Sequence, residues 1–169
     1  MIIHLRAVLA LIALCLSALI IVAGVQNPAF ADARAMILPV DKVPLVAMTA
    51  SGEKRFSIEI ADEEREQARG LMYRQTMDDD HGMLFVLSET RQSAFWMENT
   101  PMPLDLLFIG EDGRVRAILE GVPFSRASIS PGVPVRFVLE LKKGTAAKNG
   151  IAPGDRLRHP SIDTIAGSN

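Results

Sequence analysis

Cysteine is almost absent from this 169-residue chain, and the one present, Cys15, lies in an apolar stretch near the N-terminus. Beyond Cys15 the sequence has no cysteine for a disulfide bond, a thiolate nucleophile or a Cys-based zinc site. Aromatic residues make up only 5% of the chain, with a single tryptophan and a single tyrosine. Aliphatic and methionine side chains must therefore fill most of the core.

An excess of positive charge is also missing, because 18 Lys and Arg residues face 20 Asp and Glu residues. No basic patch indicates a nucleic-acid partner, and we expect none. Histidine is scarce as well, with three in the chain. No histidine lies in a recognisable catalytic triad context, and the Gly-x-Ser-x-Gly turn of many hydrolases is missing. A Ser-His hydrolase is therefore not expected.

The N-terminus has the pattern of an export signal. Arg6 precedes an uncharged apolar run over residues 7–25, and small residues frame Ala31. This pattern predicts a signal peptide over residues 1–31, cut after Ala31, whose removal changes the formal net charge from −2 to −3. The alternative is an uncleaved anchor, because the run approaches the ~20 residues that cross a bilayer. We expect an exported protein, periplasmic or anchored in the inner membrane facing the periplasm, with membrane contact only through this segment.

The remaining chain predicts a tether over residues 32–42, one β-rich domain over 43–160 and a disordered tail over 161–169. Alternating apolar and polar residues predict strands, for example over 54–60, where Phe56, Ile58 and Ile60 face in and Glu59 faces water. Turn-like stretches at 88–92 and 99–103 divide the central apolar region. A helix is expected over 62–70, capped by Asp62, and a further helical turn over 145–149. The other strands expected are 43–49, 83–87, 94–97, 104–109, 114–119, 135–141 and 156–159.

These elements define the expected fold class as mainly β (α+β). We predict a small bent sheet or β-barrel-like single domain with one short helix, and we expect a monomer.

Five sequence blocks resemble one protein family. They are ARGLMYR (68–74), GMLFVL (82–87), FWMENTPMPLDLLFI (95–109), FVLEL (137–141) and GIAPGD (150–155). In this order they are similar to the bacterial and archaeal family named domain of unknown function 192, over residues 43–158. The resemblance implies an exported or membrane-tethered single domain with a mainly β fold. It brings no established activity, cofactor or catalytic residue.

A ligand site is the functional hypothesis that we favour. An indole can stack on a sugar or peptide, amide and hydroxyl groups can hydrogen-bond to it, and guanidinium groups can meet an acidic group. The alternative is that Trp96 belongs to the core and that the prolines beside it only shape a turn. The residues expected at the site are Arg69, Arg74, Trp96, Asn99, Thr100, Asp105 and Glu140.

An enzymatic alternative uses two of these residues. Asp105 and Glu140 both lie in expected strands, and two carboxyl groups flanking a cleft are what an envelope-glycan hydrolase or lyase needs. The competing interpretation is that the carboxylates form ion pairs with Arg69, Arg74 or Arg136. We expect binding rather than catalysis.

A metal site is the third alternative. Met83, Trp96 and Met97, with His81 nearby, offer thioether and imidazole groups that suit Cu(I). Methionines more often fill a core. The acidic loop at 78–80 could bind Ca²⁺, but its spacing is not that of an EF-hand and favours a solvated turn. We expect no bound metal and no cofactor.

Overall fold

The structure is a computed structural model, and it describes residues 33–167. The predicted signal peptide and the cleavage point after Ala31 lie outside the described residues. The elements are, in chain order, β1 (Leu45–Thr49), β2 (Gly52–Ala61), α2 (Glu64–Arg69), β3 (His81–Gln92), β4 (Leu104–Ile109), β5 (Val115–Gly121), β6 (Pro134–Lys142), α3 (Thr145–Lys148), β7 (Arg156–Arg158) and α4 (Pro160–Ala166).

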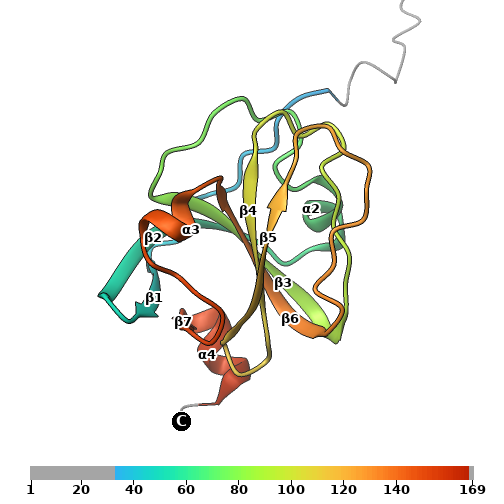
Figure 1. The fold of residues 1–169 in the computed structure, drawn as a ribbon. Coiled ribbons are helices and arrows are strands. Elements are labelled where there is room, and N and C mark those ends of the chain that lie inside the picture. The colour runs from blue at the N-terminus through green and yellow to red at the C-terminus, as the bar shows by residue number, and fades with distance from the viewer. Residues whose placement is uncertain (1–32, 168–169) are drawn as a thin grey trace, which may run out of the picture. The chain divides into compact units, whose positions relative to one another are not determined.

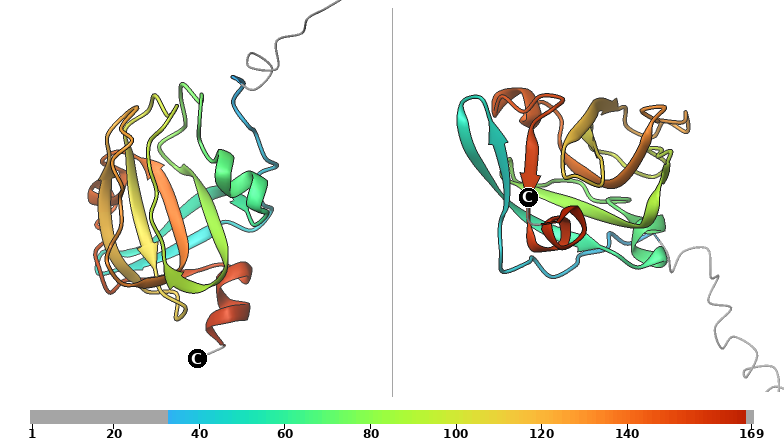
Figure 2. Two further views of the ribbon diagram at one scale, coloured as in Figure 1. Left: turned by 90° about the vertical axis from the view of Figure 1, so that its right-hand side faces the viewer. Right: turned by 90° about the horizontal axis from the view of Figure 1, so that it is seen from below.

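All seven strands form one sheet in the order β5-β4-β6-β3-β2-β1-β7. Only β2 and β3 are parallel, and the connection between them contains α2. The sheet curls strongly, so that the start of β5 comes beside β7 (Figures 1 and 2). There the Val115 N–H donates to the Asp155 carbonyl oxygen at 2.9 Å, and the Leu157 N–H donates to Gly113 at 2.8 Å. The result is a curled half-barrel, which confirms the predicted mainly β class.

The sheet has a hydrophobic cluster on each face. The inner cluster joins residues from both ends of the sheet, such as Leu45, Leu157 and Val115, so it fills the concave side, where Ile162 of α4 also packs. The outer cluster lies on the other face and includes Met83, Phe85, Leu106, Phe108 and Val138. Loop residues cover it in place of helices, namely Leu71, Met77, Met97, Met102 and, packed at its margin, Met36, Leu38 and Ile129.

The ends of the domain are more ordered than the composition predicts. In place of a disordered tail from residue 161, α4 runs to Ala166, with the His159 side chain accepting a hydrogen bond from the Ser161 N–H at its start. Ile162 is buried, which explains why so polar a segment is held. The described part therefore has three short helices where one was expected.

Two central segments differ from prediction. Strand β3 continues through the expected turn at 88–92, because a bulge after Val86 restores pairing of Arg91 with Val135. Residues 94–97 form no strand, only an isolated bridge between Phe95 and Ile129. The helix expected from Asp62 begins after Glu63, whose side chain forms a capping box with Glu66.

Gly82 allows β3 and β6 to approach closely. A Cβ atom at this position would lie 2.7 Å from the Glu140 carbonyl oxygen and 2.7 Å from a methyl group of Leu141. No side chain fits there without moving backbone. This contact places Glu140 directly beside Met83, its register partner on β3.

Candidate functional site

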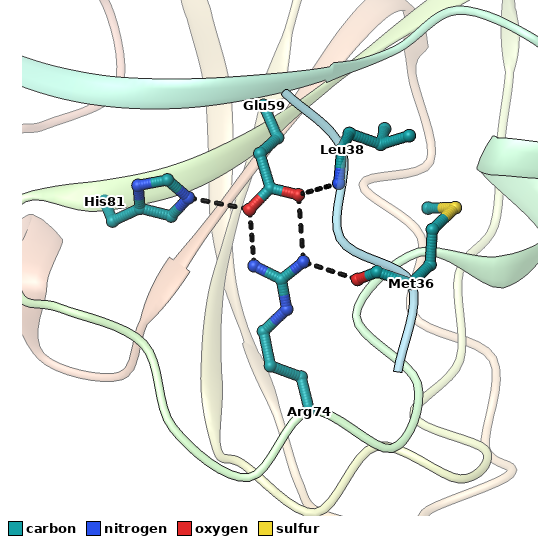
Figure 3. Close-up of polar contacts among 5 residues, drawn as sticks. All are labelled: Met36, Leu38, Glu59, Arg74 and His81. Atoms are coloured by element: carbon teal, nitrogen blue, oxygen red, sulfur yellow. Dashed lines mark hydrogen bonds and ion pairs between the residues drawn. The ribbon is translucent and has the colours of Figure 1, made fainter. Parts of the chain in front are cut away.

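A buried polar cluster lies around Glu59 of β2, on the outer face of the sheet. Arg74 donates two hydrogen bonds to the Glu59 carboxylate, from Nη1 at 2.5 Å and from Nη2 at 2.9 Å. His81 Nε2 lies 2.8 Å from Oε1, and the Leu38 N–H donates to Oε2 at 2.8 Å. Figure 3 shows all these contacts converging on the one carboxylate. Both Glu59 and Arg74 are buried.

The partners of Glu59 set its charge. Burial by itself would raise the pKa of Glu59, but the hydrogen bonds from Arg74, His81 and the Leu38 N–H, with the positive charge of Arg74, lower it below the ordinary value. Glu59 is therefore ionised and compensated, as a buried charge must be to be tolerated.

The same cluster fastens the segment that was expected to be a tether. Besides the bond from Leu38, the Met36 carbonyl accepts from Arg74 Nη2 at 2.6 Å, and the Asp41 N–H donates to Ile58 at 2.8 Å. Val40 forms an isolated bridge with Glu59. Residues 36–41 are thus held against β2, and Arg74 acts as a structural clamp here.

Glu140 occupies an equivalent position without any of these partners. In the register of the sheet, Glu59 pairs with Met83 and Met83 pairs with Glu140, so the two glutamates lie on the same face in one row. Glu140 is buried, and its side chain makes no hydrogen bond or ion pair with any described residue. Burial raises the pKa of Glu140 to about 8, so it is mostly protonated at neutral pH.

Asp105 lies on the opposite face of the sheet from Glu140. It pairs with Leu141, whereas Glu140 pairs with Leu106, and an offset of one residue reverses the face. The Asp105 Oδ2 accepts a hydrogen bond from the Ala146 N–H at 2.9 Å, which caps α3. The two carboxylates cannot flank one cleft, so the alternative of a glycan-cleaving pair made by Asp105 and Glu140 is wrong. The alternative partner Arg74 is wrong too, because it pairs with Glu59.

Trp96 is not a core residue. Its exposed fraction is 52%, whereas the neighbouring Met97 is fully buried and Phe95 packs edge-on against Phe85 and Phe108. The indole forms part of the wall of two hollows, one of about 350 Å³ beside Arg91 and Ser93 and one of about 190 Å³ beside Arg126. The interpretation of Trp96 as a core residue is therefore wrong.

Three loops meet beside this surface, each with a strained residue. Tyr73, Asn99 and Phe124 are the described non-glycine residues with positive φ, at 64°, 55° and 60°. The Tyr73 N–H donates to the Asn99 backbone carbonyl oxygen at 2.7 Å, and the Phe124 N–H donates to the Thr100 backbone carbonyl oxygen at 3.1 Å. Backbone strain of this kind gathers where surrounding structure enforces a shape, often at functional sites.

The remaining expected site residues divide between this surface and other roles. Arg69 of α2 stacks over the Tyr73 ring at 4.8 Å and so lies at the loop junction. Asn99 and Thr100 also belong to the junction, although Thr100 is buried. Arg74, Asp105 and Glu140 do not reach the Trp96 hollows, whose lining residues do not include them.

The groups of the two metal alternatives are not assembled into a site. Met83 and Met97 are buried in the outer cluster, while the Trp96 indole lies in solvent, so the copper grouping is not formed. Within residues 33–167 no cluster of three His, Cys, Asp or Glu side chains could hold a metal ion. In the acidic loop, Asp79 instead pairs with Lys142 and Lys148, whose hydrogen bonds and charges lower the pKa of Asp79.

Sequence reasoning missed the Glu59 cluster. The alternation in β2 assigned Glu59 to the wet face, but loop residues cover that face and leave Glu59 only 2% exposed. The available signal for Arg74 was its place in the ARGLMYR block, which is one of the five blocks that resemble one family. No local pattern could have connected Arg74 with a glutamate 15 residues earlier.

The fold and its surface define a class: a small curled half-barrel with a buried carboxylate–guanidinium clamp and an exposed tryptophan at a loop junction. The chain belongs to the DUF192 family, described as an uncharacterized ACR, whose model matches residues 46–159. No curated protein matches the chain.

Two solved structures are similar over nearly their whole length. One is a Sinorhizobium meliloti 1021 protein provisionally named a transcription regulator, which is 43% identical and has a TM-score of 0.70. The match covers 75% of this chain and 99% of the Sinorhizobium chain. The other is a protein of unknown function from Novosphingobium aromaticivorans DSM 12444, 37% identical, with a TM-score of 0.68, covering 81% of this chain and 100% of its own.

Proposed function

We propose that this protein is an exported binding domain of the cell envelope, which acts without catalysis and uses the surface around Trp96. The observation that carries this proposal is the position of the single tryptophan, 52% exposed between two hollows. Tryptophan is enriched among the residues that contribute most to binding at recognition sites. Fixed loops at its side supply a preorganised setting.

The proposed export rests on the apolar segment before Ala31, with the domain released after cleavage or left anchored by that segment. In the described part of the chain, no helix has the length and apolar character to cross a membrane. The provisional name of the Sinorhizobium protein is not carried over, because a formal charge of −3 after cleavage opposes binding to phosphate backbones. We propose a monomer that binds an envelope component.

Two measurements test export. Fractionation of cells that produce the full chain should place it in the periplasm or on the inner membrane. Mass spectrometry of the purified protein should give an N-terminus at Asp32 if the signal is cut. A cytoplasmic, full-length protein would contradict the proposal.

Co-sedimentation tests the surface. We expect the protein to sediment with murein sacculi or with phosphatidylethanolamine–phosphatidylglycerol vesicles, and Trp96→Ala to lose this association. Because the indole is half in solvent, the same variant should change the free energy of unfolding by about 1 kcal/mol or less, against about 3–5 kcal/mol for a core tryptophan. Met48→Ala is the matched control, since Met48 is 43% exposed on β1 and lines neither Trp96 hollow. Equal loss in both variants, or none in Trp96→Ala, would contradict the proposed surface.

A further inference from the structure

Each of the two hollows at Trp96 has one arginine among its lining residues, and only one of these arginines has an acidic partner. Arg126, beside the smaller hollow, forms an ion pair with Glu98 at 2.6 Å. The side chain of Arg91, beside the larger hollow, makes no hydrogen bond or ion pair with any residue from 33 to 167. The larger hollow therefore has an uncompensated positive charge at its wall.

The larger hollow also contains polar groups that the fold leaves unused. Ser93 lines it, and the Ser93 Oγ is buried without a hydrogen-bond partner. Gln67 of α2 donates through Nε2 to the Val86 carbonyl at 2.8 Å and to Ala61 at 3.3 Å, which leaves its amide oxygen as an acceptor. A buried hydroxyl without a partner is unfavourable and requires an explanation. A ligand that hydrogen-bonds to the Ser93 hydroxyl and the Gln67 amide oxygen would provide this explanation.

The combination of groups specifies the ligand chemistry. A flat indole offers its face to the C–H surface of a sugar ring, as an aromatic ring does to any apolar surface of its size. The Ser93 hydroxyl and the Gln67 and Gln92 amides are neutral donors and acceptors that match sugar hydroxyl groups. A guanidinium without a counter-charge matches a carboxylate, which it binds through two parallel hydrogen bonds. Leu87, Ala68 and Phe95 complete the wall with apolar surface.

We propose that the hollow between α2, the end of β3 and Trp96 binds a saccharide unit that carries a carboxylate. Trp96 stacks on the ring, Ser93 and Gln67 hold its hydroxyl groups, and Arg91 determines the preference for an acidic sugar. This inference rests on the proposed binding function of the Trp96 surface and names its ligand class. Arg126 contributes little to acid recognition, because Glu98 already neutralises it.

Trp96 is the sole tryptophan, so tryptophan fluorescence reports on this site alone. The measurement uses the chain without its signal peptide. The probes are trigalacturonate and galactotriose, which share a sugar skeleton and differ in the carboxylates. We expect trigalacturonate to bind at least about tenfold more tightly at low salt, as a charge-assisted bidentate contact provides. Arg91→Gln should remove this preference and leave galactotriose affinity within about twofold, and Arg91→Lys should restore only part of it.

Arg126→Gln is the matched control, because it removes a guanidinium beside the same indole. It should change trigalacturonate affinity by no more than about threefold. Both arginines are exposed, so circular dichroism and thermal melting should be unchanged in the variants. Equal affinity for the two trisaccharides, or an acid preference that survives Arg91→Gln, would overturn this inference and leave the proposed function standing. Binding of a glutamate-rich tripeptide with no response to either saccharide would overturn it as well. Loss of co-sedimentation in Trp96→Ala would still support the proposed function in each case.

Discussion

Glu59 and Glu140 are two buried glutamates in the same row of the same sheet face, and they have opposite charge states. Glu59 is 2% exposed and Glu140 is 5% exposed, so burial is nearly the same for both. Glu59 receives hydrogen bonds from Arg74, His81 and the Leu38 N–H, and its pKa is lowered. Glu140 receives none from any described residue, and its pKa is raised to about 8.

The difference shows that partners, not depth, decide whether a buried carboxyl group is charged. The charged glutamate works as a structural joint, since the Arg74 clamp also holds the Met36 carbonyl and so attaches residues 36–41 to the sheet. The neutral glutamate joins nothing in the described part of the chain. Their pH dependences must also differ in sign, and this provides the sharpest tests of the comparison.

The largest expected effect comes from removing the clamp. Arg74→Met leaves the Glu59 carboxylate buried without its main partner, so we expect the free energy of unfolding to fall by about 3–5 kcal/mol at pH 7, measured by urea denaturation. The matched double variant Arg74→Met, Glu59→Gln should recover part of this loss, because no charge is then buried.

The pH dependence of that loss follows from the lowered pKa of Glu59. A group with a lowered folded pKa contributes stability above its unfolded value of 4.5, and the contribution disappears as the pH falls through the folded pKa. The gap between wild type and Arg74→Met should therefore narrow in acid. A gap that is constant from pH 7 to pH 3 would show that Arg74 acts through packing alone.

Glu140→Gln should have the opposite pH dependence and a smaller effect. The folded pKa of about 8 exceeds the unfolded value of 4.5, so the contribution of Glu140 is fully present below pH 4.5 and is lost as the pH rises to about 8. Gln stays neutral throughout. From pH 5 to pH 7 we expect wild type to lose about 2–3 kcal/mol relative to the variant, measured by urea denaturation at each pH. Parallel profiles would mean that Glu140 has a partner or ionises freely in the folded protein.

The sequence was sufficient to predict the sheet because the signal for a strand is local. Period-two alternation in segments such as β2 and β5, with glycines at the turns, places most strands within a few residues of their observed bounds. Two predictions failed. The polar end of β3 was missed, because Arg91 and Gln92 pair with β6 across a bulge that no alternation reveals. Residues 94–97 were expected to form a strand and form only an isolated bridge.

The candidate site was harder to predict because faces and partners depend on register. Asp105 and Glu140 lie on neighbouring strands as expected, but a single residue of register places them on opposite faces. Glu59 was assigned to solvent because the loops that cover it come from distant parts of the sequence. The exposure of Trp96 was one of two alternatives left open, since an apolar neighbourhood in sequence is equally typical of a core position.

Asp105 is the intermediate case between the two glutamates, with one hydrogen bond and partial burial, and its effect should be the smallest. Asp105→Ala removes the acceptor for the Ala146 N–H at the start of α3, so we expect a loss of about 1 kcal/mol, the usual cost of a missing helix cap. Asp105→Asn is the matched control, because its amide oxygen can accept the same bond. It should recover most of the loss in thermal or urea denaturation. If Asn is as harmful as Ala, the negative charge of Asp105 contributes more to stability than its hydrogen bond, and Asp105 would then resemble Glu59 more than Glu140.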